Sequence, residues 1–369
     1  MKIDDFFLKF TDKLAYLDLK KEAADKLNVS VTMPIRVSDF SQGIRQGDFD
    51  DHIDASLFVK GIIWNLAIDP DFIYANEYKR VIKNLVKKPA DMAIQMGMES
   101  IENNDQISAL IAFRAANILD EKNKFAKLQY GNLLWRMEDL DEDTKNNFIK
   151  KASSLFEEAL RIDDKDPLIN LSLGQLNEYL GNFSKALAYY QIALSEGKTD
   201  DFNDQVREAM RGIESEAEIE DAIYHMRRAD YAGALDHLIT LGAKSDRWDV
   251  DYYAGLCKQN LSDYQGACQF FNMALEKGGY LEDIYNGLVY NYTALGDVDG
   301  ALIAANSGLK KFPEALRIRF NRAIILFQKG KNKEALDDLD YILAYQDLSD
   351  EFFNQIMMLK EEINKVKAD

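Results

Sequence analysis

Apolar residues follow helical spacing along most of the chain, and small residues stand at fixed places among them. In the segment 167–200, Gly174 is followed by Ala186, Tyr190 and Ala193. Small residues at the first two positions allow two antiparallel helices to cross closely, and the aromatic ring fills the space beside them. Ala193 is small because the second helix also packs against the hairpin that follows. The segment therefore predicts a helical hairpin with a buried inner face.

This order of residues recurs with a period of 34 residues, which is clearest between the units that begin at Trp248, Glu282 and Leu316. Each hairpin buries its apolar side only against a neighbour, so the last one needs a cover. We predict a capping helix over residues 350–369 as this cover. The seven predicted hairpins span about 90–123, 124–166, 167–200, 215–247, 248–281, 282–315 and 316–349.

Two segments interrupt the period. Nine extra residues in the second unit, within 138–147, are expected to lengthen the turn between its two helices. Asp139, Asp141 and Asp143 are spaced as in a calcium loop, but the Gly and Glu that such a loop requires at its sixth and twelfth places are missing, which favours a solvated insertion. The acidic stretch 200–221 is either an extra helix or an extended junction.

Residues 1–89 do not follow the period, and we predict a mostly helical N-terminal domain there. Apolar residues at its start have helical spacing, at Phe6, Phe10, Leu14 and Leu17. We expect this domain to pack on the first repeat.

A second part of the N-terminal region has a different pattern. Residues 29–37 alternate between apolar and polar side chains and are broken by Pro34, which predicts a short hairpin or an extended arm. Residues 61–71 could be a degenerate extra repeat, although the order of Ala, aromatic and Ala is missing there.

Composition and charge narrow the class of protein. Only 5 Pro in 369 residues leave few helix breaks, in agreement with a mostly helical chain. The net charge is −18, and residues 1–89 hold 14 of the 45 Lys and Arg and 14 of the 63 Asp and Glu, so the acidic excess lies in the repeats. An acidic surface repels phosphate backbones, so we expect no nucleic-acid partner. The same charge either favours a basic partner or serves solubility alone.

Residues able to carry chemistry are few. His52, His225 and His237 were assigned to separate units and lack metal-ligand spacing, so we expect no metal site. Cys257 and Cys268 are interpreted as reduced, buried, small apolar residues. Because the chain also lacks phosphate-loop, nucleophile-elbow and Cys–His patterns, we expect no cofactor and no enzymatic activity.

The start of the chain and its hydropathy bear on location. The residues after Met1 are charged and then amphipathic, unlike a secretion signal. No stretch reaches the about 18 uninterrupted apolar residues of a membrane span. We therefore expect a cytoplasmic protein without membrane insertion.

The recurring order of small, aromatic and small residues resembles the tetratricopeptide repeat (TPR) family over about residues 90–367. The resemblance implies an all-α fold, namely a right-handed α-solenoid of about seven TPR-type helical hairpins with a C-terminal capping helix and a mostly helical N-terminal region. It also implies that the first helix of each hairpin lines a concave groove. The side chains at groove positions that we select as candidates for partner binding are Asn132, Trp135, Gln175, Tyr179, Arg227, Tyr252, Gln259, Asn286, Tyr290, Phe320 and Phe327.

The resemblance further implies that this groove binds other proteins. Aromatic rings offer contact area at low entropic cost, and amide side chains can bond a peptide backbone in both directions. Each aromatic residue could instead pack between adjacent first helices. The favoured hypothesis is an adaptor, scaffold or assembly factor that binds a peptide segment of a partner protein. The alternative is a regulatory receptor for a short signalling peptide that acts through protein contacts.

Overall fold

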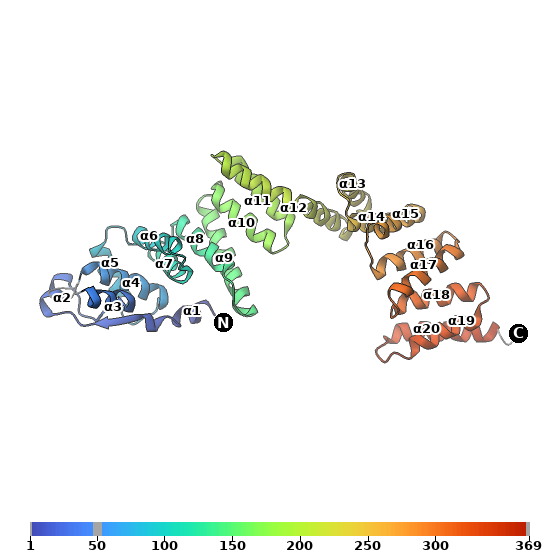
Figure 1. Ribbon diagram of the computed structural model, residues 1–369, viewed down its shortest axis with the longest axis horizontal. Helices are drawn as coiled ribbons and strands as arrows, with labels where there is room; N and C mark the ends of the chain where they lie inside the picture. The colour runs from blue at the N-terminus through green and yellow to red at the C-terminus, as the bar shows by residue number, and fades with distance from the viewer. Residues whose placement is uncertain (1, 47–53, 367–369) are drawn as a thin grey trace. The chain divides into compact units, whose positions relative to one another are not determined.

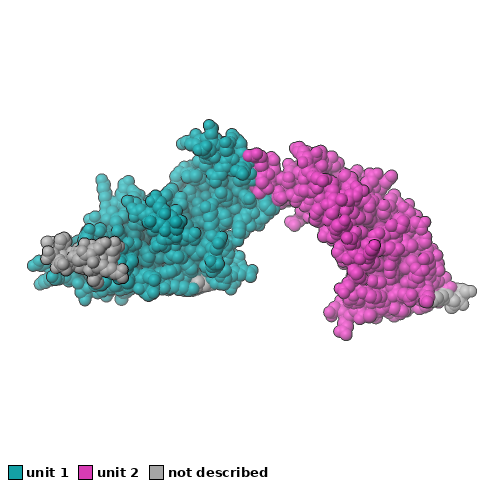
Figure 2. Space-filling view, viewed as in Figure 1, with its two compact units in different colours: residues 1–210 teal, residues 211–369 magenta. Residues whose placement is uncertain are grey.

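The computed structural model describes residues 2–46 and 54–366 (Figure 1). Apart from one two-stranded sheet near the N-terminus, the regular structure in these residues is helical, which confirms the predicted all-α repeat fold. Contacts divide the chain into two units, residues 1–210 and residues 211–369, which are coloured separately in Figure 2. None of the described helices is long and apolar enough to cross a membrane.

The N-terminal region combines short helices with an antiparallel sheet. Its elements are α1 (Ile3–Leu8), a 3-10 turn (Thr11–Lys13), β1 (Leu14–Leu17), α2 (Lys21–Leu27), β2 (Met33–Arg36), α3 (Val37–Gln46), α4 (Ala55–Ile68) and α5 (Ala75–Leu85). In the sheet, Leu14 lies opposite Arg36 and Leu17 lies opposite Met33. The helical interpretation of Leu14 and Leu17 was therefore wrong. Pairing with a distant strand outweighs the local apolar spacing.

The extended segment has a partner that local sequence does not reveal. Residues 29–37 do contain a strand, but β2 pairs with β1 and not within its own segment. Helix α4 covers β2 so closely that a Cβ atom added at Gly61 would lie 2.0 Å from the carbonyl oxygen of Pro34. Gly61 thus lets a helix approach a strand, and not a second helix as in a repeat.

Three hairpins complete the first unit (Figure 1). They are α6 (Pro89–Glu102) with α7 (Gln106–Leu119), α8 (Lys124–Arg136) with α9 (Glu142–Ile162), and α10 (Pro167–Tyr179) with α11 (Phe183–Glu196). In the third hairpin, a Cβ atom added at Gly174 would lie 2.4 Å from the ring of Tyr190, and Gly97 and Gly131 approach aromatic rings of their own hairpins in the same way. The close crossing inferred from these glycines is therefore present.

The insertion in the second hairpin lengthens mainly the second helix, α9, which has 21 residues where α7 and α11 have 14, and only slightly the turn, residues 137–141. Asp141 caps α9 by accepting hydrogen bonds from the Thr144 backbone N–H (2.9 Å) and hydroxyl (2.6 Å). Further along the added turns, the buried ring of Phe148 packs edge-on against Phe6, with 5.0 Å between centroids. The lengthened helix α9 therefore supports α1, whose sequence gave no sign of this contact.

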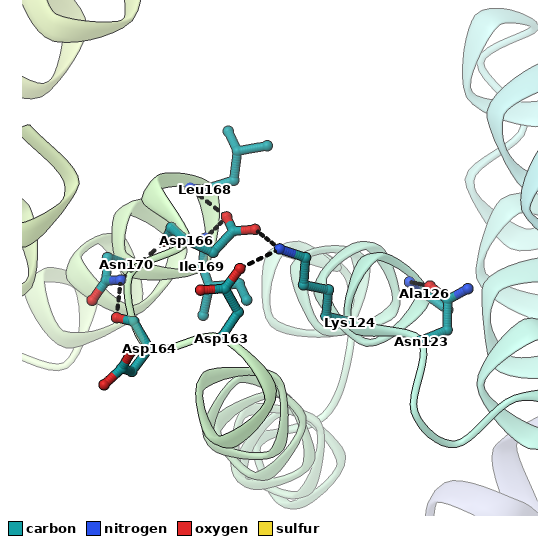
Figure 3. Close-up of polar contacts among 9 residues, drawn as sticks. All are labelled: Asn123, Lys124, Ala126, Asp163, Asp164, Asp166, Leu168, Ile169 and Asn170. Atoms are coloured by element: carbon teal, nitrogen blue, oxygen red, sulfur yellow. Dashed lines mark hydrogen bonds and ion pairs between the residues drawn. The ribbon is translucent and has the colours of Figure 1, made fainter. Parts of the chain in front are cut away.

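An ionic contact joins the start of α8 to the start of α10. Lys124, the first residue of α8, donates hydrogen bonds to Asp163 and Asp166, each over 2.6 Å (Figure 3). Asp166 also caps α10 by accepting from the Leu168 N–H over 2.9 Å. This contact holds the N-terminal ends of α8 and α10 together, and the candidate site lies at their C-terminal ends.

The second unit continues the series of hairpins. Its helices are the C-terminal part of α12 (Asp200–Arg227), then α13 (Tyr231–Gly242), α14 (Trp248–Asn260), α15 (Tyr264–Glu276), α16 (Glu282–Ala294), α17 (Val298–Lys311), α18 (Leu316–Gln328), α19 (Asn332–Leu343) and α20 (Asp350–Val366). The acidic stretch 200–221 is thus helical and continues into the first helix of the fourth hairpin. Ile356 and Ile363 of α20 are buried in one core with Ala323 of α18 and Leu339 of α19, as expected of a capping helix.

Candidate functional site

Two predicted aromatic residues meet at the C-terminal ends of α8 and α10. The ring centroids of Trp135 and Tyr179 are 5.5 Å apart and the ring planes are inclined by 50°. Tyr179 is 54% exposed and Trp135 is half-buried, so the pair has a free face. The pair borders a cleft of about 510 Å³ whose lining residues are Trp135, Arg136, Gln175, Glu178, Tyr179, Tyr190, Gln205, Glu208 and Ala209.

The predicted amides of this site bond to neighbouring first helices. Asn132 donates from Nδ2 to the hydroxyl of Ser172 over 3.1 Å, which links α8 to α10. The Oε1 atom of Gln175 accepts from the guanidinium of Arg136 over 2.6 Å and forms a second link. Asn132 and Gln175 therefore hold the two helices in register, and part of their hydrogen-bonding capacity is already used.

Two cations at this site were missed from sequence. The guanidinium of Arg136 lies 5.0 Å from the centroid of the Trp135 ring. Lys145 of α9 donates to the carbonyl oxygens of Trp135 (2.6 Å) and Met137 (2.8 Å), and its ammonium is 5.5 Å from the Tyr179 ring centroid. Arg136 occupies a groove position next to Trp135 and could have been selected. Lys145 belongs to the insertion, for which the repeat pattern makes no prediction.

One carboxylate of the cleft is held by a buried phenol. The hydroxyl of Tyr190 donates to Oε2 of Glu178 over 2.5 Å. Burial, together with the adjacent carboxylate, raises the pKa of Tyr190 well above that of a free tyrosine. The phenol therefore stays protonated as a donor, and it fixes the orientation of Glu178 at the edge of the cleft.

The second unit has a separate cleft beside the capping helix. Its volume is about 460 Å³ and its lining residues are Asn286, Arg317, Phe320, Asn321, Ser349, Glu351, Phe352 and Gln355. Asn321 donates from Nδ2 to Oδ1 of Asn286 over 2.9 Å, and the ring of Phe320 is 5.3 Å from that of Phe352. Of the predicted residues, Asn286 and Phe320 come together here.

The remaining predicted residues are a mixture of packed and open side chains. Tyr252 and Phe327 are partly buried against core clusters, and Gln259 accepts from Nδ2 of Asn291 over 2.8 Å. Tyr290 is 52% exposed, and Arg227 is exposed at the last residue of α12. Packing against the core therefore accounts for Tyr252 and Phe327, and Tyr252 packs on Phe271 of the second helix of its own hairpin.

The histidines are arranged differently from the prediction. Assigning them to separate units was wrong for His225 and His237, which lie on α12 and α13 of one hairpin with ring centroids 5.3 Å apart. His52 lies outside the described residues. Cys257 and Cys268 are buried as predicted, and burial raises the pKa of each thiol to about 11. Among the described residues, no group of three or more His, Cys, Asp or Glu could hold a metal ion.

Comparison with known families identifies the repeat. Residues 287–348, which run from α16 to α19, match the model of the tetratricopeptide repeat family. The same close approach of a first-helix glycine to a second-helix aromatic ring occurs in the hairpins that contain Gly97, Gly131, Gly174 and Gly255. Residues 287–348 are therefore similar to the tetratricopeptide repeat family, and the glycine–aromatic contacts show the same packing in earlier hairpins.

Solved structures with helical repeats are similar at low identity. PilF of Pseudomonas aeruginosa is 14% identical over 62% of this chain and 95% of its own, with a TM-score of 0.33. A tetratricopeptide repeat protein of Parabacteroides merdae is 16% identical over 74% and 98%, also with a TM-score of 0.33. Yeast Tom70 is 14% identical over 85% and 59%, with a TM-score of 0.38. At these TM-scores the likenesses carry no argument about function. No curated protein matches the sequence.

Proposed function

We propose that the chain is a protein-interaction module, an adaptor, scaffold or assembly factor, that binds a peptide segment of a partner protein across α8 and α10. The observation that carries this proposal is the Trp135–Tyr179 pair, which borders an open cleft of about 510 Å³. The match of residues 287–348 to the tetratricopeptide repeat family supports the class of function, and the cleft supports the place of binding.

The energetics of the ring pair favour a binding role. About half of the Tyr179 side chain is exposed to water, although burial of an aromatic ring is energetically favourable. In protein interfaces such aromatic side chains are often hot spots, which contribute about 2 kcal/mol or more to binding. Because Asn132, Gln175 and Arg136 hold the helices in register, the rings are fixed before a partner arrives, which lowers the entropic cost of binding.

The chemistry of the partner segment follows from charge and lining. Residues outside 1–89 hold 31 of the 45 Lys and Arg but 49 of the 63 Asp and Glu, so the field of the repeats favours a segment with net positive charge. Glu178 and Glu208 lie on the α10 and α12 sides of the cleft. The partner segment therefore carries an apolar side chain for the rings and basic side chains for the opposite side.

The test begins with capture of the partner by the full chain from the cells that make it, identified by mass spectrometry. The affinity of that partner is then measured for the unchanged chain and for Trp135→Ala and Tyr179→Ala. We expect each variant to weaken binding by about 30-fold, the equivalent of about 2 kcal/mol. Tyr280→Ala is the matched control, because Tyr280 is 53% exposed and lies far along the chain from the cleft. Equal affinity in all four proteins would exclude the cleft as the binding site.

A further inference from the structure

The fourth hairpin brings together two of the three histidines in the chain. His225 lies near the C-terminal end of α12 and His237 lies in α13, and the ring planes are inclined by 31° at a centroid distance of 5.3 Å. The side chains are 34% and 39% exposed, so both rings can be reached from solvent. Neither residue belongs to the clefts described above.

Each imidazole has its Nδ1 atom engaged by a carboxylate. Nδ1 of His225 is 2.8 Å from Oδ2 of Asp230, and Nδ1 of His237 is 3.1 Å from Oε2 of Glu218. A carboxylate accepts only from a protonated nitrogen, so the neutral imidazole carries its hydrogen on Nδ1 and its lone pair on Nε2. Histidines that bind metal ions show this arrangement, in which the outer carboxylate fixes the tautomer and raises the basicity of the binding nitrogen.

The carboxylate beside His225 is itself fixed. Asp230 is the N-cap of α13 and accepts from the Gly233 N–H over 3.0 Å. The position of the carboxylate is therefore set by the helix that it caps.

The separation of the rings fits a bridging ion. With a zinc–nitrogen bond of about 2.0–2.1 Å and a tetrahedral angle at the metal, two imidazole rings bound through Nε2 have centroids about 5.2 Å apart. The observed separation is 5.3 Å. The centroid separation therefore matches the distance that one bridging ion requires.

We propose that His225 and His237 bind one divalent cation of the zinc class through their Nε2 atoms, with Asp230 and Glu218 as positioning residues. The described residues supply no group of three or more ligands, so the other coordination positions of the ion belong to water. A site with two protein ligands exchanges its ion, unlike a closed structural zinc site.

The ion would reinforce a hairpin with a small core. The buried side chains of α12 and α13 in this cluster are Ile219, Ala222, Ala234, Leu235, Leu238 and Leu241, without a buried aromatic ring among them. Binding to the folded hairpin and not to the unfolded chain stabilises the hairpin in proportion to the free ion concentration. Zinc should therefore slow hydrogen exchange of the backbone amides in α13.

The experiment is a calorimetric titration of the full chain with zinc chloride. We expect one ion per chain, at least a tenfold weaker affinity in His225→Gln and in His237→Gln, and no change in His52→Gln. Far-UV circular dichroism of each variant checks that the helices remain folded. Absence of zinc binding, an affinity that neither the His225 nor the His237 variant alters, or its loss in His52→Gln would overturn the proposal.

A second pair of variants tests the positioning carboxylate. Asp230→Asn keeps the capping oxygen and the volume of the side chain but removes the charge that orients His225, and we expect about tenfold weaker zinc binding. Asp263→Asn is the matched control, since Asp263 caps α15 in the same way by accepting from the Gly266 N–H over 2.9 Å. This control should leave the zinc affinity unchanged. Equal affinities of the Asp230 and Asp263 variants would refute the positioning role of Asp230.

Discussion

Replacement of Gly174 by Ala sets two opposing effects against each other within one helix. Glycine in the middle of a helix costs about 0.5–1 kcal/mol relative to alanine, so helix propensity alone predicts stabilisation by Gly174→Ala. The added Cβ atom would lie 2.4 Å from Cε1 and 2.5 Å from Cδ1 of Tyr190. Tyr190 is fully buried and its hydroxyl is held by Glu178, so the ring has little freedom to move aside.

Overpacking of this kind costs about 1–3 kcal/mol, which exceeds the gain in helix propensity. We therefore expect Gly174→Ala to destabilise the α10–α11 hairpin by about 1–2 kcal/mol. Gly212 of α12 is the matched control, because it is exposed and a Cβ atom there meets nothing within 4 Å. Gly212→Ala should stabilise its helix by about 0.5–1 kcal/mol.

The assay is hydrogen exchange of backbone amides, followed by mass spectrometry of peptides from α10, α11 and α12. A local measurement is needed because arrays of repeats do not unfold as one two-state unit. Faster exchange in α10 and α11 of Gly174→Ala, with slower exchange around residue 212 in Gly212→Ala, is the expected result. If both substitutions slow exchange, the close approach of Gly174 to Tyr190 does not limit stability and the reasoning is refuted.

Two further predictions concern charged groups. The hydrogen bond from Lys124 lowers the pKa of Asp163, so the stabilisation from this pair is complete above the ordinary aspartate pKa of about 3.9 and is lost as the pH falls through the lower folded value. Lys124→Met should therefore flatten the acid side of the local stability of α8 and α9, measured by hydrogen exchange of their backbone amides between about pH 6 and about pH 2, and an unchanged profile would contradict this. Lys127, whose side chain is 5% exposed, lies 2.5 Å from Glu158, which is 33% exposed. Glu158→Gln should cost about 3 kcal/mol because it leaves a buried ammonium without its ionic partner and only the neutral Asn117 close by, and Lys127→Met should cost less because Glu158 can be hydrated. Hydrogen exchange of the backbone amides in α8 and α9 of the two variants gives their order, and the reverse order would show that the pair is not desolvated.

The difference between Trp135 and Tyr252 shows the limit of site prediction from a repeat pattern. Both were selected from groove positions on first helices, but Trp135 borders an open cleft, whereas Tyr252 packs 6.2 Å from the buried ring of Phe271. The repeat frame specifies which face of a helix a residue occupies. It does not specify whether a neighbouring side chain covers that face, because that depends on residues such as Lys145, which lies outside the frame.

The same limit applies to the polar residues. Asn132 and Gln259 were selected because amides can bond a peptide, and each instead makes a hydrogen bond to the next first helix. His225 and His237 were assigned to separate units, although the interval between them fits one hairpin. The two rings come together because they lie on the facing sides of α12 and α13. A search for histidines spaced along a single helix cannot detect this arrangement.

The sequence by itself determined the helical repeat, because small residues at fixed intervals are needed wherever two helices cross closely. The contact of Gly174 with the ring of Tyr190 is one such crossing. The sequence also predicted a covering helix after the seventh hairpin, because a hairpin without a neighbour exposes an apolar face, and the structure buries Ile356 and Ile363 of that helix. Tertiary structure alone decided the pairing of β1 with β2, the support of α1 by the lengthened α9, and the exposure of the Trp135–Tyr179 pair. Those features depend on contacts between segments that are distant in sequence. Such contacts form only in the folded chain, and they override the local preferences that a sequence pattern reports.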